Sequence, residues 1–140
     1  MQNKVRAMEQ VRQIIIIDDD PLNNFICTTA IRLYNPEITL VDFLSAEEGW
    51  SYIADKKNHP PQETRILVLL DLNMIGLSGW EFLDRFKQLD DDARSRFRVF
   101  ILSSSVDRMD RSKIESNELV AGYILKPLTN AQLETMLPRA

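Results

Sequence analysis

Short apolar runs alternate with amphipathic segments along the chain, and this alternation predicts a parallel α/β fold. The clearest run, residues 14–17, is four isoleucines in a row. A strand that is apolar on both sides belongs inside a sheet covered by helices on both faces. Strands are predicted over 13–18, 38–43, 65–70, 97–102 and 121–125. Right-handed crossovers between them would give a doubly wound, five-stranded parallel sheet with helices on both faces.

Helix-start signals lie between the predicted strands. Asp20 before Pro21 is typical of an N-cap with proline at the first helical position, and it opens a helix over 21–34. That helix carries the spacing of a stripe facing the core, at Leu22, Phe25, Ile26, Thr29, Ala30 and Leu33. Capping pairs predict three later helix starts, at Ser45/Glu48, Ser78/Glu81 and Thr129/Gln132. A less apolar segment, 107–119, predicts a weakly packed helix.

Composition and charge narrow the function classes. With 140 residues, 44% of them hydrophobic and 27% charged, the chain suits one globular domain over 13–140, behind a polar lead-in over 1–12. A net charge of −4 provides no basic field for phosphate backbones, which argues against direct nucleic-acid binding. The sequence has no run of 18 apolar residues and no signal-peptide core, so we expect no membrane span and a cytoplasmic location.

Three features that could suggest chemistry have simpler explanations. Cys27, the lone cysteine, excludes an intramolecular disulfide and falls inside a predicted helix, where a buried apolar role is expected. His59 precedes Pro60-Pro61 in a predicted surface loop, which favours a solvated ring over a catalytic one. The acidic run 90–92 follows a helix rather than a strand, so we interpret it as an exposed charge cluster.

Chemically reactive side chains follow four of the five predicted strands. Asp18 and Asp19 follow the first, Asp71 the third, Ser103 the fourth and Lys126 the fifth. Because the carboxyl ends of parallel strands share one edge, we expect these residues to converge. Clustered carboxylates repel one another, and a bound Mg²⁺ would offset that repulsion. With a lysine to hold an anion and a hydroxyl to donate to it, the set predicts a phosphoryl-transfer site.

Four motifs in this order and spacing resemble the receiver domains of two-component response regulators, over residues 13–137. The motifs are IIIIDDD at 14–20, LLDLNMIGLSG at 69–79, FILSS at 100–104 and GYILKP at 122–127. The resemblance implies a flavodoxin-like fold. It also implies that Asp71 is phosphorylated by a histidine of a partner kinase.

The resemblance further implies how the acidic residues divide the work. Asp19 would bind Mg²⁺ directly, Asp18 would assist through a water molecule, and Asn73 would contribute its backbone carbonyl to the metal.

Two departures from the family pattern lie in the loop after Asp71. Ile75 stands where receivers often carry proline, and Ser78 where an acidic residue often precedes the glycine, so both should alter the rigidity of the loop rather than the chemistry.

The remaining matched residues would act on the phosphorylated state. By the same resemblance, Lys126 would pair with the acyl phosphate and Ser103 would hydrogen-bond it. Tyr123 would be the aromatic switch that rotates inward when Ser103 moves.

The implied partners are proteins. A sensor histidine kinase or a histidine phosphotransfer protein would supply the phosphoryl group. A downstream protein would bind the face formed by the 107–119 helix, the last strand and the last helix. Because no output segment follows residue 137, we expect a stand-alone receiver, monomeric or weakly dimeric. It would be a regulatory domain that catalyses only its own phosphorylation and dephosphorylation.

Two other functions compete with this interpretation. Asp18 and Asp20 also satisfy the Asp-x-Asp pattern of small Mg²⁺-dependent phosphatases of the haloacid dehalogenase class. Against that class, Leu22 replaces its usual threonine or valine, no acidic pair follows Lys126, and Asp71 would be idle. The second competitor is a flavodoxin-like interaction module that is never phosphorylated.

Overall fold

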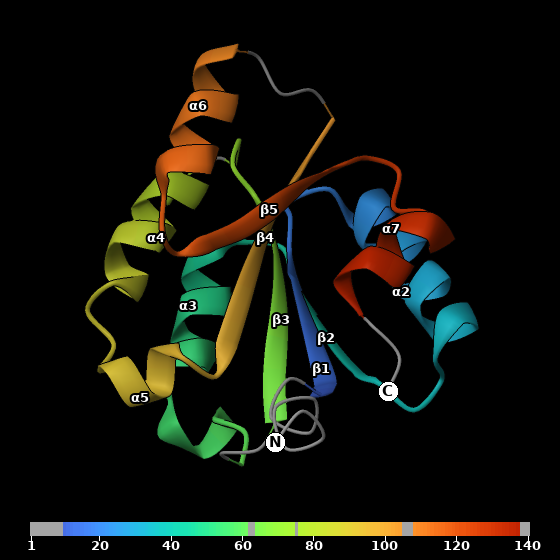
Figure 1. Cartoon of the computed structure of the whole chain (residues 1–140), viewed down its shortest axis with the longest axis horizontal. Coiled ribbons are helices and arrows are strands. Elements are labelled where there is room, and N and C mark those ends of the chain that lie inside the picture. Colours follow the sequence, from blue (N-terminus) through green and yellow to red (C-terminus); the bar gives the residue numbers. More distant parts are fainter. Residues whose placement is uncertain (1–9, 62–63, 75, 105–107, 138–140) are drawn as a thin grey trace.

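Figure 1 shows the computed structural model of the chain, which describes residues 10–61, 64–74, 76–104 and 108–137. Its centre is a five-stranded sheet in the order β2-β1-β3-β4-β5, and every neighbouring pair is parallel. The strands are β1 (Gln10–Ile17), β2 (Thr39–Phe43), β3 (Thr64–Asp71), β4 (Phe97–Ser103) and β5 (Val120–Leu125). The predicted doubly wound, flavodoxin-like sheet is confirmed. The strand order reverses between β1 and β3, which is where such sheets bind ligands beyond their carboxyl ends.

Helices cover both faces of the sheet, as predicted. On one face lie α2 (Pro21–Tyr34) and α7 (Asn130–Met136), and on the other lie α3 (Ala46–Ala54), α4 (Gly79–Phe86) and α6 (Arg108–Ser116) (Figure 1). The isoleucine run alternates between the two faces. Ile15 and Ile17 join the core under α3 and α4, whereas Ile14 and Ile16 join the core under α2 and α7. All four side chains are fully buried, so β1 unites both halves of the core.

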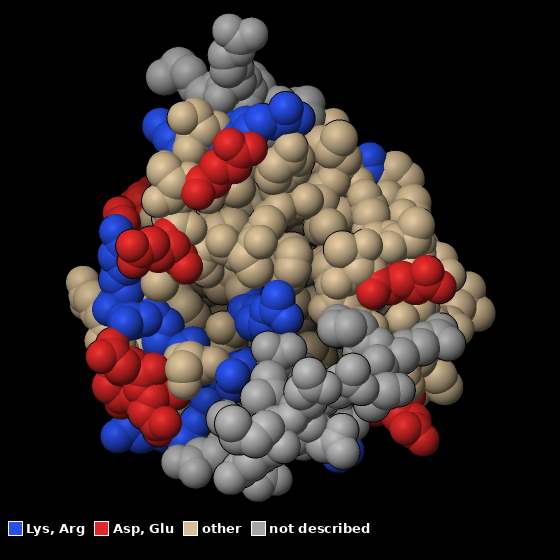
Figure 2. Space-filling view, in the orientation of Figure 1, with Lys and Arg blue, Asp and Glu red and all other residues tan. Residues whose placement is uncertain are grey.

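The surface is mixed in charge. Lys and Arg side chains lie among Asp and Glu side chains over the described part of the face seen in Figure 2, rather than in one basic field. The exclusion of nucleic acid stays a prediction. Among the helices of the described ranges, none combines the length and apolar character that crossing a membrane requires.

The predicted helix starts at the carboxyl edge are confirmed. Asp20 Oδ1 accepts a hydrogen bond from the Leu22 backbone N–H at 3.0 Å, and Pro21 is the first residue of α2. The capping boxes that open α4 and α7 are complete, with Ser78 and Thr129 as their N-caps. These caps fix where α2 and α4 begin, beyond the two strand ends that carry the predicted acids.

Several boundaries differ from prediction. β1 begins at Gln10 rather than residue 13, because Gln10 and Val11 continue the backbone pairing to β3 across a register shift between Val11 and Gln13. The helix that opens after Ser45 ends at Ala54, and a 3₁₀ turn, η1 (Lys56–Asn58), follows separately. The apolar pattern does not predict these features, because backbone pairing and short turns do not depend on apolar spacing.

The acidic run 90–92 builds a helical turn that the pattern did not predict. Asp90 Oδ1 accepts the Ala93 N–H at 2.7 Å and starts the one-turn helix α5 (Asp91–Arg94). The carboxylates of Asp91 and Asp92 are exposed and pair with Arg94 and Arg96. The interpretation as an exposed charge cluster is confirmed, and the same charges also cap and brace a turn.

The predicted inward face of α2 is wrong. Leu22, Phe25 and Leu33 are 65%, 67% and 83% exposed, whereas the buried positions are Asn23, Asn24, Cys27 and Ile31. The helix is turned because the Asp18 carboxylate and nearby backbone carbonyls take their hydrogen bonds from the two asparagine amides. Polar requirements at the start of the helix therefore decide its orientation. The buried role of Cys27 is confirmed, and burial raises the pKa of its thiol to about 11.

His59 is not the solvated ring that its loop composition suggested. Its side chain is half-buried, with the ring edge against Phe97 at 5.6 Å between centroids. Its Nε2 lies 2.7 Å from the Ile53 carbonyl. The turn η1 returns the loop toward α3, so the ring packs between the end of that helix and Phe97.

Gly79 provides a test of how tightly α4 is joined to the end of β3. A Cβ at this position would lie 2.7 Å from both the Asp71 carbonyl oxygen and the Leu72 Cα, which are backbone atoms that cannot easily move. We predict that Gly79→Ala lowers the free energy of unfolding by about 1–3 kcal/mol. Helix propensity alone predicts a gain of about 1 kcal/mol, so the sign of the change is informative.

Urea denaturation measures this difference. Asp84→Ala, an exposed change in the same helix, serves as the control and should alter the stability by less than about 0.5 kcal/mol. A Gly79→Ala protein as stable as the wild type would contradict the close approach of α4 to β3.

Candidate functional site

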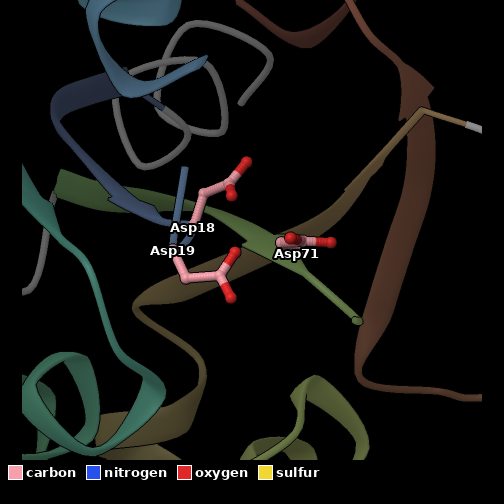
Figure 3. Close-up of side chains that lie close together, drawn as sticks. All are labelled: Asp18, Asp19 and Asp71. Atoms are coloured by element: carbon pink, nitrogen blue, oxygen red, sulfur yellow. The ribbon is translucent and has the colours of Figure 1, made fainter. Parts of the chain in front are cut away.

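Three carboxylates meet beyond the ends of two neighbouring strands. Asp71 is the last residue of β3, and Asp18 and Asp19 follow β1, whose Ile17 pairs with Leu70. One oxygen from each carboxylate lies within 4.8 Å of the others. Figure 3 shows the three side chains gathered beyond these strand ends. Asp18 and Asp71 are buried, whereas Asp19 is exposed, so the cluster opens to solvent on the Asp19 side.

Asp18 is the most enclosed of the three, and protein donors surround it. Its Oδ2 accepts hydrogen bonds from Lys126 Nζ at 2.7 Å and from Asn23 Nδ2 at 2.8 Å. Its Oδ1 accepts the Asp20 backbone N–H at 3.0 Å. A fully buried carboxylate needs such partners, because an unpaired buried charge is costly.

Lys126 reaches the cluster from the far edge of the sheet. It follows β5, and its backbone N–H donates to the Ser103 carbonyl at 2.8 Å. Its ammonium lies 2.7 Å from Asp18 Oδ2 and 3.9 Å from Asp71 Oδ2. Burial alone would lower the pKa of Lys126, but the hydrogen bond to Asp18 and the charge of Asp71 outweigh it and raise the pKa above its ordinary value. The lysine is therefore a charged group between two carboxylates, closer to Asp18 than to Asp71.

Asp71 is held in an unfavourable charge state. Burial raises the pKa of Asp71 to about 6, and the negative charge of Asp18 adds to this rise. The Asn73 backbone N–H, which donates to Asp71 Oδ1 at 3.2 Å, and the charge of Lys126 lower the pKa in part. A carboxylate that resists ionisation in this way gains most from any added positive charge.

Ser103 and Tyr123 occupy the next two strands. Ser103 is the last residue of β4, is 4% exposed, and pairs with Leu125 across the sheet. Tyr123 lies in β5, half-buried, with the Arg111 guanidinium 5.4 Å from the centre of its ring. The structure thus brings Ser103 to the edge of the cluster, whereas Tyr123 lies further back along its strand.

The loop after Asp71 turns sharply into α4. Gly76 has a φ of +85°, a backbone conformation that favours glycine, and Ser78 caps the helix. Asn73 is exposed at the start of this loop. Ile75, a predicted departure from the family pattern, lies outside the described residues.

Two buried polar side chains near the site were missed in the sequence, and the placement of Asp20 weakens the phosphatase alternative. Asn23 and Asn24 are buried beside Asp18, a place that their polar character alone did not suggest. The signal was an amide pair directly inside a helix that follows an acidic triplet. Asp20, by contrast, lies outside the carboxylate cluster and caps α2. This placement leaves the phosphatase alternative without its second acid.

The site suits a small, hard cation. Three carboxylate oxygens within 4.8 Å of one another, one carboxylate exposed, are the ligand type that Mg²⁺ prefers, with room left for water. Burial, and beyond it the charge of Asp18, raises the pKa of Asp71, so a bound cation would favour its ionised form. Asp18, Asp19 and Asp71 are therefore the residues able to hold Mg²⁺.

Comparison with known proteins decides the family. A family model described as the response regulator receiver domain matches residues 14–138, nearly the whole chain. The chain belongs to the response regulator receiver family. The resemblance recognised from the four motifs is therefore confirmed, and the phosphatase alternative is wrong. A comparison with curated proteins found no match.

Solved receiver structures share the fold along most of their length. A two-component response regulator from Cytophaga hutchinsonii is 30% identical with a TM-score of 0.80, and the match covers 91% of this chain and 94% of that one. A response regulator receiver protein from Dyadobacter fermentans is 26% identical with a TM-score of 0.77, over 91% and 98% of the two chains. The chemotaxis protein CheY4 from Vibrio cholerae, at 13% identity and a TM-score of 0.65 over 91% and 96%, shares the fold.

The raised pKa of Asp71 predicts a stability that depends on pH. The folded pKa of about 6 exceeds the unfolded value of 3.8, so the folded receiver binds more protons between these values and loses stability as pH rises through them. We predict that Asp71→Asn, which removes the charge, stabilises the receiver at pH 7.5 by about 2 kcal/mol without Mg²⁺.

Chemical denaturation at several pH values tests this prediction. The advantage of Asp71→Asn should shrink as pH falls through 6 toward 4, because Asp71 becomes protonated in the folded state. Added Mg²⁺ should stabilise the wild type more than the variant. Equal stability of the two proteins across this pH range would show that the Asp71 charge is not destabilising.

Proposed function

We propose that this receiver accepts a phosphoryl group on Asp71 from a phosphohistidine of a sensor kinase or phosphotransfer protein, in a Mg²⁺-dependent reaction, and thereby changes a surface that binds a downstream protein. The observation that carries the proposal is the position of Asp71. Its carboxylate lies within 4.8 Å of two other acids and 3.9 Å from the half-buried Lys126. This arrangement favours a single acceptor beside fixed positive charge.

The chain's own residues prepare Asp71 for attack. The Asn73 N–H occupies Oδ1, and Oδ2 lies on the side of Lys126, so we assign Oδ2 as the nucleophile. Its attack forms the O–P bond as the P–N bond of the phosphohistidine breaks, and the bonding pair stays on the imidazole nitrogen. When bound, Mg²⁺ would neutralise negative charge on the carboxylates and phosphoryl oxygens. Asp18 and Asp19 would hold it together with Asp71, and the Asn73 carbonyl is a further candidate ligand.

Lys126 and Ser103 would then hold the product. The new group adds about −1.5 to −2 charges and three acceptor oxygens to a site that is already acidic. The Lys126 ammonium is close enough to pair with it, and Ser103 would donate its hydroxyl from the adjacent strand end. A displacement of Ser103 would free space for Tyr123, the proposed aromatic switch.

The face formed by α6, β5 and α7 is the proposed output surface. Among the α6 side chains that the structure describes, Ile114 is buried against the domain, and two cations lie over aromatic rings. Arg111 lies over Tyr123 at 5.4 Å, and Lys113 over Trp80 at 5.7 Å. Such cation–π contacts can rearrange at low cost when the strand end before the helix changes.

The exposed face of α2 is the proposed contact for the phosphoryl donor. Leu22 and Phe25 are 65% and 67% exposed on the first turns of the helix that Asp20 caps, next to the open side of the acidic cluster. A protein donor must approach the open side of the acidic cluster, and so come close to Leu22 and Phe25, to bring its histidine to Asp71. Exposed apolar side chains at such a place indicate a protein contact.

A small acyl-phosphate donor tests the acceptor directly. With acetyl phosphate and Mg²⁺, the wild-type receiver should become phosphorylated, Asp71→Asn should show no incorporation, and Asp18→Ala should react only weakly. Chelation of Mg²⁺ should stop the reaction. Undiminished labelling of Asp71→Asn would refute the proposal, and absence of any labelling would favour the unphosphorylated interaction module.

Asp20→Asn is the matched control for the acidic site. Because Asp20 caps α2 and lies outside the carboxylate cluster, its replacement should lower the stability of the receiver by about 1 kcal/mol or less and leave the phosphorylation rate nearly unchanged. Turnover of a phosphate ester that depends on Asp20 and not on Asp71 would contradict the receiver assignment of these acids.

The donor contact has its own test. We predict that Phe25→Ser slows phosphoryl transfer from a histidine-phosphorylated protein by about tenfold, the effect of losing roughly 1.4 kcal/mol of apolar contact, and leaves the rate with acetyl phosphate unchanged. Rapid-quench kinetics with both donors measure the two rates. An equal effect on both donors would mean that Phe25 acts on the site rather than on docking.

A further inference from the structure

We propose that Asn23 is a positioning residue for this reaction: by sharing the Asp18 carboxylate with Lys126, it leaves Lys126 available to the phosphoryl group on Asp71. The inference rests on the proposed phosphorylation of Asp71. It assigns a role to a helix residue that lies outside the four motifs and acts through Asp18 rather than on Asp71 itself.

The burial of the Asn23 side chain requires an explanation. Asn23 is 5% exposed on the inward face of α2, a position that an apolar residue could fill. Its amide Nδ2 lies 2.8 Å from Asp18 Oδ2 and 3.6 Å from Cys27 Sγ. Because a buried amide costs free energy unless it is well hydrogen-bonded, and sulfur is a weak acceptor, the carboxylate is the partner that justifies its presence.

Two donors converge on the same oxygen. Lys126 Nζ and Asn23 Nδ2 approach Asp18 Oδ2 at 2.7 and 2.8 Å, while Oδ1 takes the Asp20 N–H at 3.0 Å. A carboxylate oxygen offers two lone pairs, so both acceptor sites of Oδ2 are filled. Each donor stabilises the negative charge and so reduces the attraction that remains for the other. Asn23 therefore weakens the hold of Asp18 on Lys126.

Asn23 also protects Asp18 when the lysine turns away. Lys126 Nζ is 3.9 Å from Asp71 Oδ2 before phosphorylation and must move toward the new oxygens to pair with them. Asp18 is fully buried, so loss of the lysine without a second donor would leave a charged oxygen unsatisfied. With Asn23 in place, Oδ2 keeps one hydrogen bond throughout. The amide thus lowers the free-energy cost of moving the cation from one carboxylate to the other.

Asn24 supplies a matched control. It is 2% exposed on the same turn of α2, and its Nδ2 donates to the backbone carbonyls of Asp18 at 3.1 Å and Phe43 at 3.4 Å. It therefore ties the ends of β1 and β2 together and gives no hydrogen bond to the Asp18 carboxylate. Loss of its amide should affect the stability of the strand ends rather than the lysine.

The test compares Asn23→Leu and Asn24→Leu in three measurements: the phosphorylation rate with acetyl phosphate, the Mg²⁺ dissociation constant by calorimetry, and the thermal midpoint. Asn23→Leu should slow phosphorylation about tenfold, as expected for losing one hydrogen bond to a charged group. Its Mg²⁺ affinity should stay within about twofold of wild type or increase, because Asp18 has lost a competing donor. Asn24→Leu should lower the thermal midpoint and keep the phosphorylation rate.

Specific outcomes overturn the inference. A phosphorylation rate for Asn23→Leu within about twofold of wild type would refute it. A parallel fall in rate, Mg²⁺ affinity and thermal midpoint would assign Asn23 a structural role only. If Asp71→Asn still incorporates phosphate, the proposed function fails first, so the two failures are distinguishable.

A measurement on the wild-type receiver avoids any folding defect of the variants. The phosphoryl mimic beryllofluoride with Mg²⁺ should draw Lys126 toward Asp71 and leave Asn23 as the side-chain donor to Asp18 Oδ2. The Asn23 side-chain NH₂ signal in NMR should then exchange more slowly with solvent than in the free receiver. Unchanged or faster exchange would contradict the proposed sharing of the carboxylate.

Discussion

The ion pair between Lys126 and Asp18 is the interaction on which the carboxyl edge of this receiver depends. It spans the sheet from the end of β5 to the end of β1, with Nζ 2.7 Å from Oδ2 and side chains that are 18% and 0% exposed. Three carboxylates within 4.8 Å of one another would otherwise repel. Burial, and to a smaller extent the charge of Asp18, keeps the pKa of Asp71 raised even with the lysine in place. The residual imbalance is what a cation or a transferable phosphoryl group can exploit.

The parts of the site that were predictable are those that chain topology dictates. Short apolar runs such as 14–17 are typical of buried strands, and parallel strands end at one edge, so Asp18, Asp71 and Lys126 were expected to approach one another. The helix caps were equally readable, because Asp20-Pro21 and Ser78 with Glu81 satisfy backbone donors locally. Local capping signals and strand order were therefore enough to predict the fold and the acidic residues of the site.

What escaped prediction depends on contacts between distant segments. The apolar spacing of α2 pointed Phe25 inward, yet hydrogen bonds from Asn23 and Asn24 to the end of β1 turn that face to solvent. Likewise the His59 ring lies against the Ile53 carbonyl and the Phe97 ring, and both of these residues lie outside the loop that contains His59. Hydrophobic periodicity carries no information about the hydrogen-bond donors that a buried carboxylate needs. Where the apolar pattern and the hydrogen bonding disagree, a functional site is the expected reason.

The central claim is that Asp71 accepts phosphate while Lys126 passes from Asp18 to the new group. A crystal structure of the receiver with Mg²⁺ and beryllofluoride tests it most directly. The account predicts beryllium bonded to an Asp71 carboxylate oxygen, Lys126 Nζ within hydrogen-bond distance of a fluorine, and Asn23 still bound to Asp18. Beryllofluoride bound to a residue other than Asp71 would contradict the claim. So would a complex in which beryllofluoride is bound to Asp71 but Lys126 still pairs with Asp18.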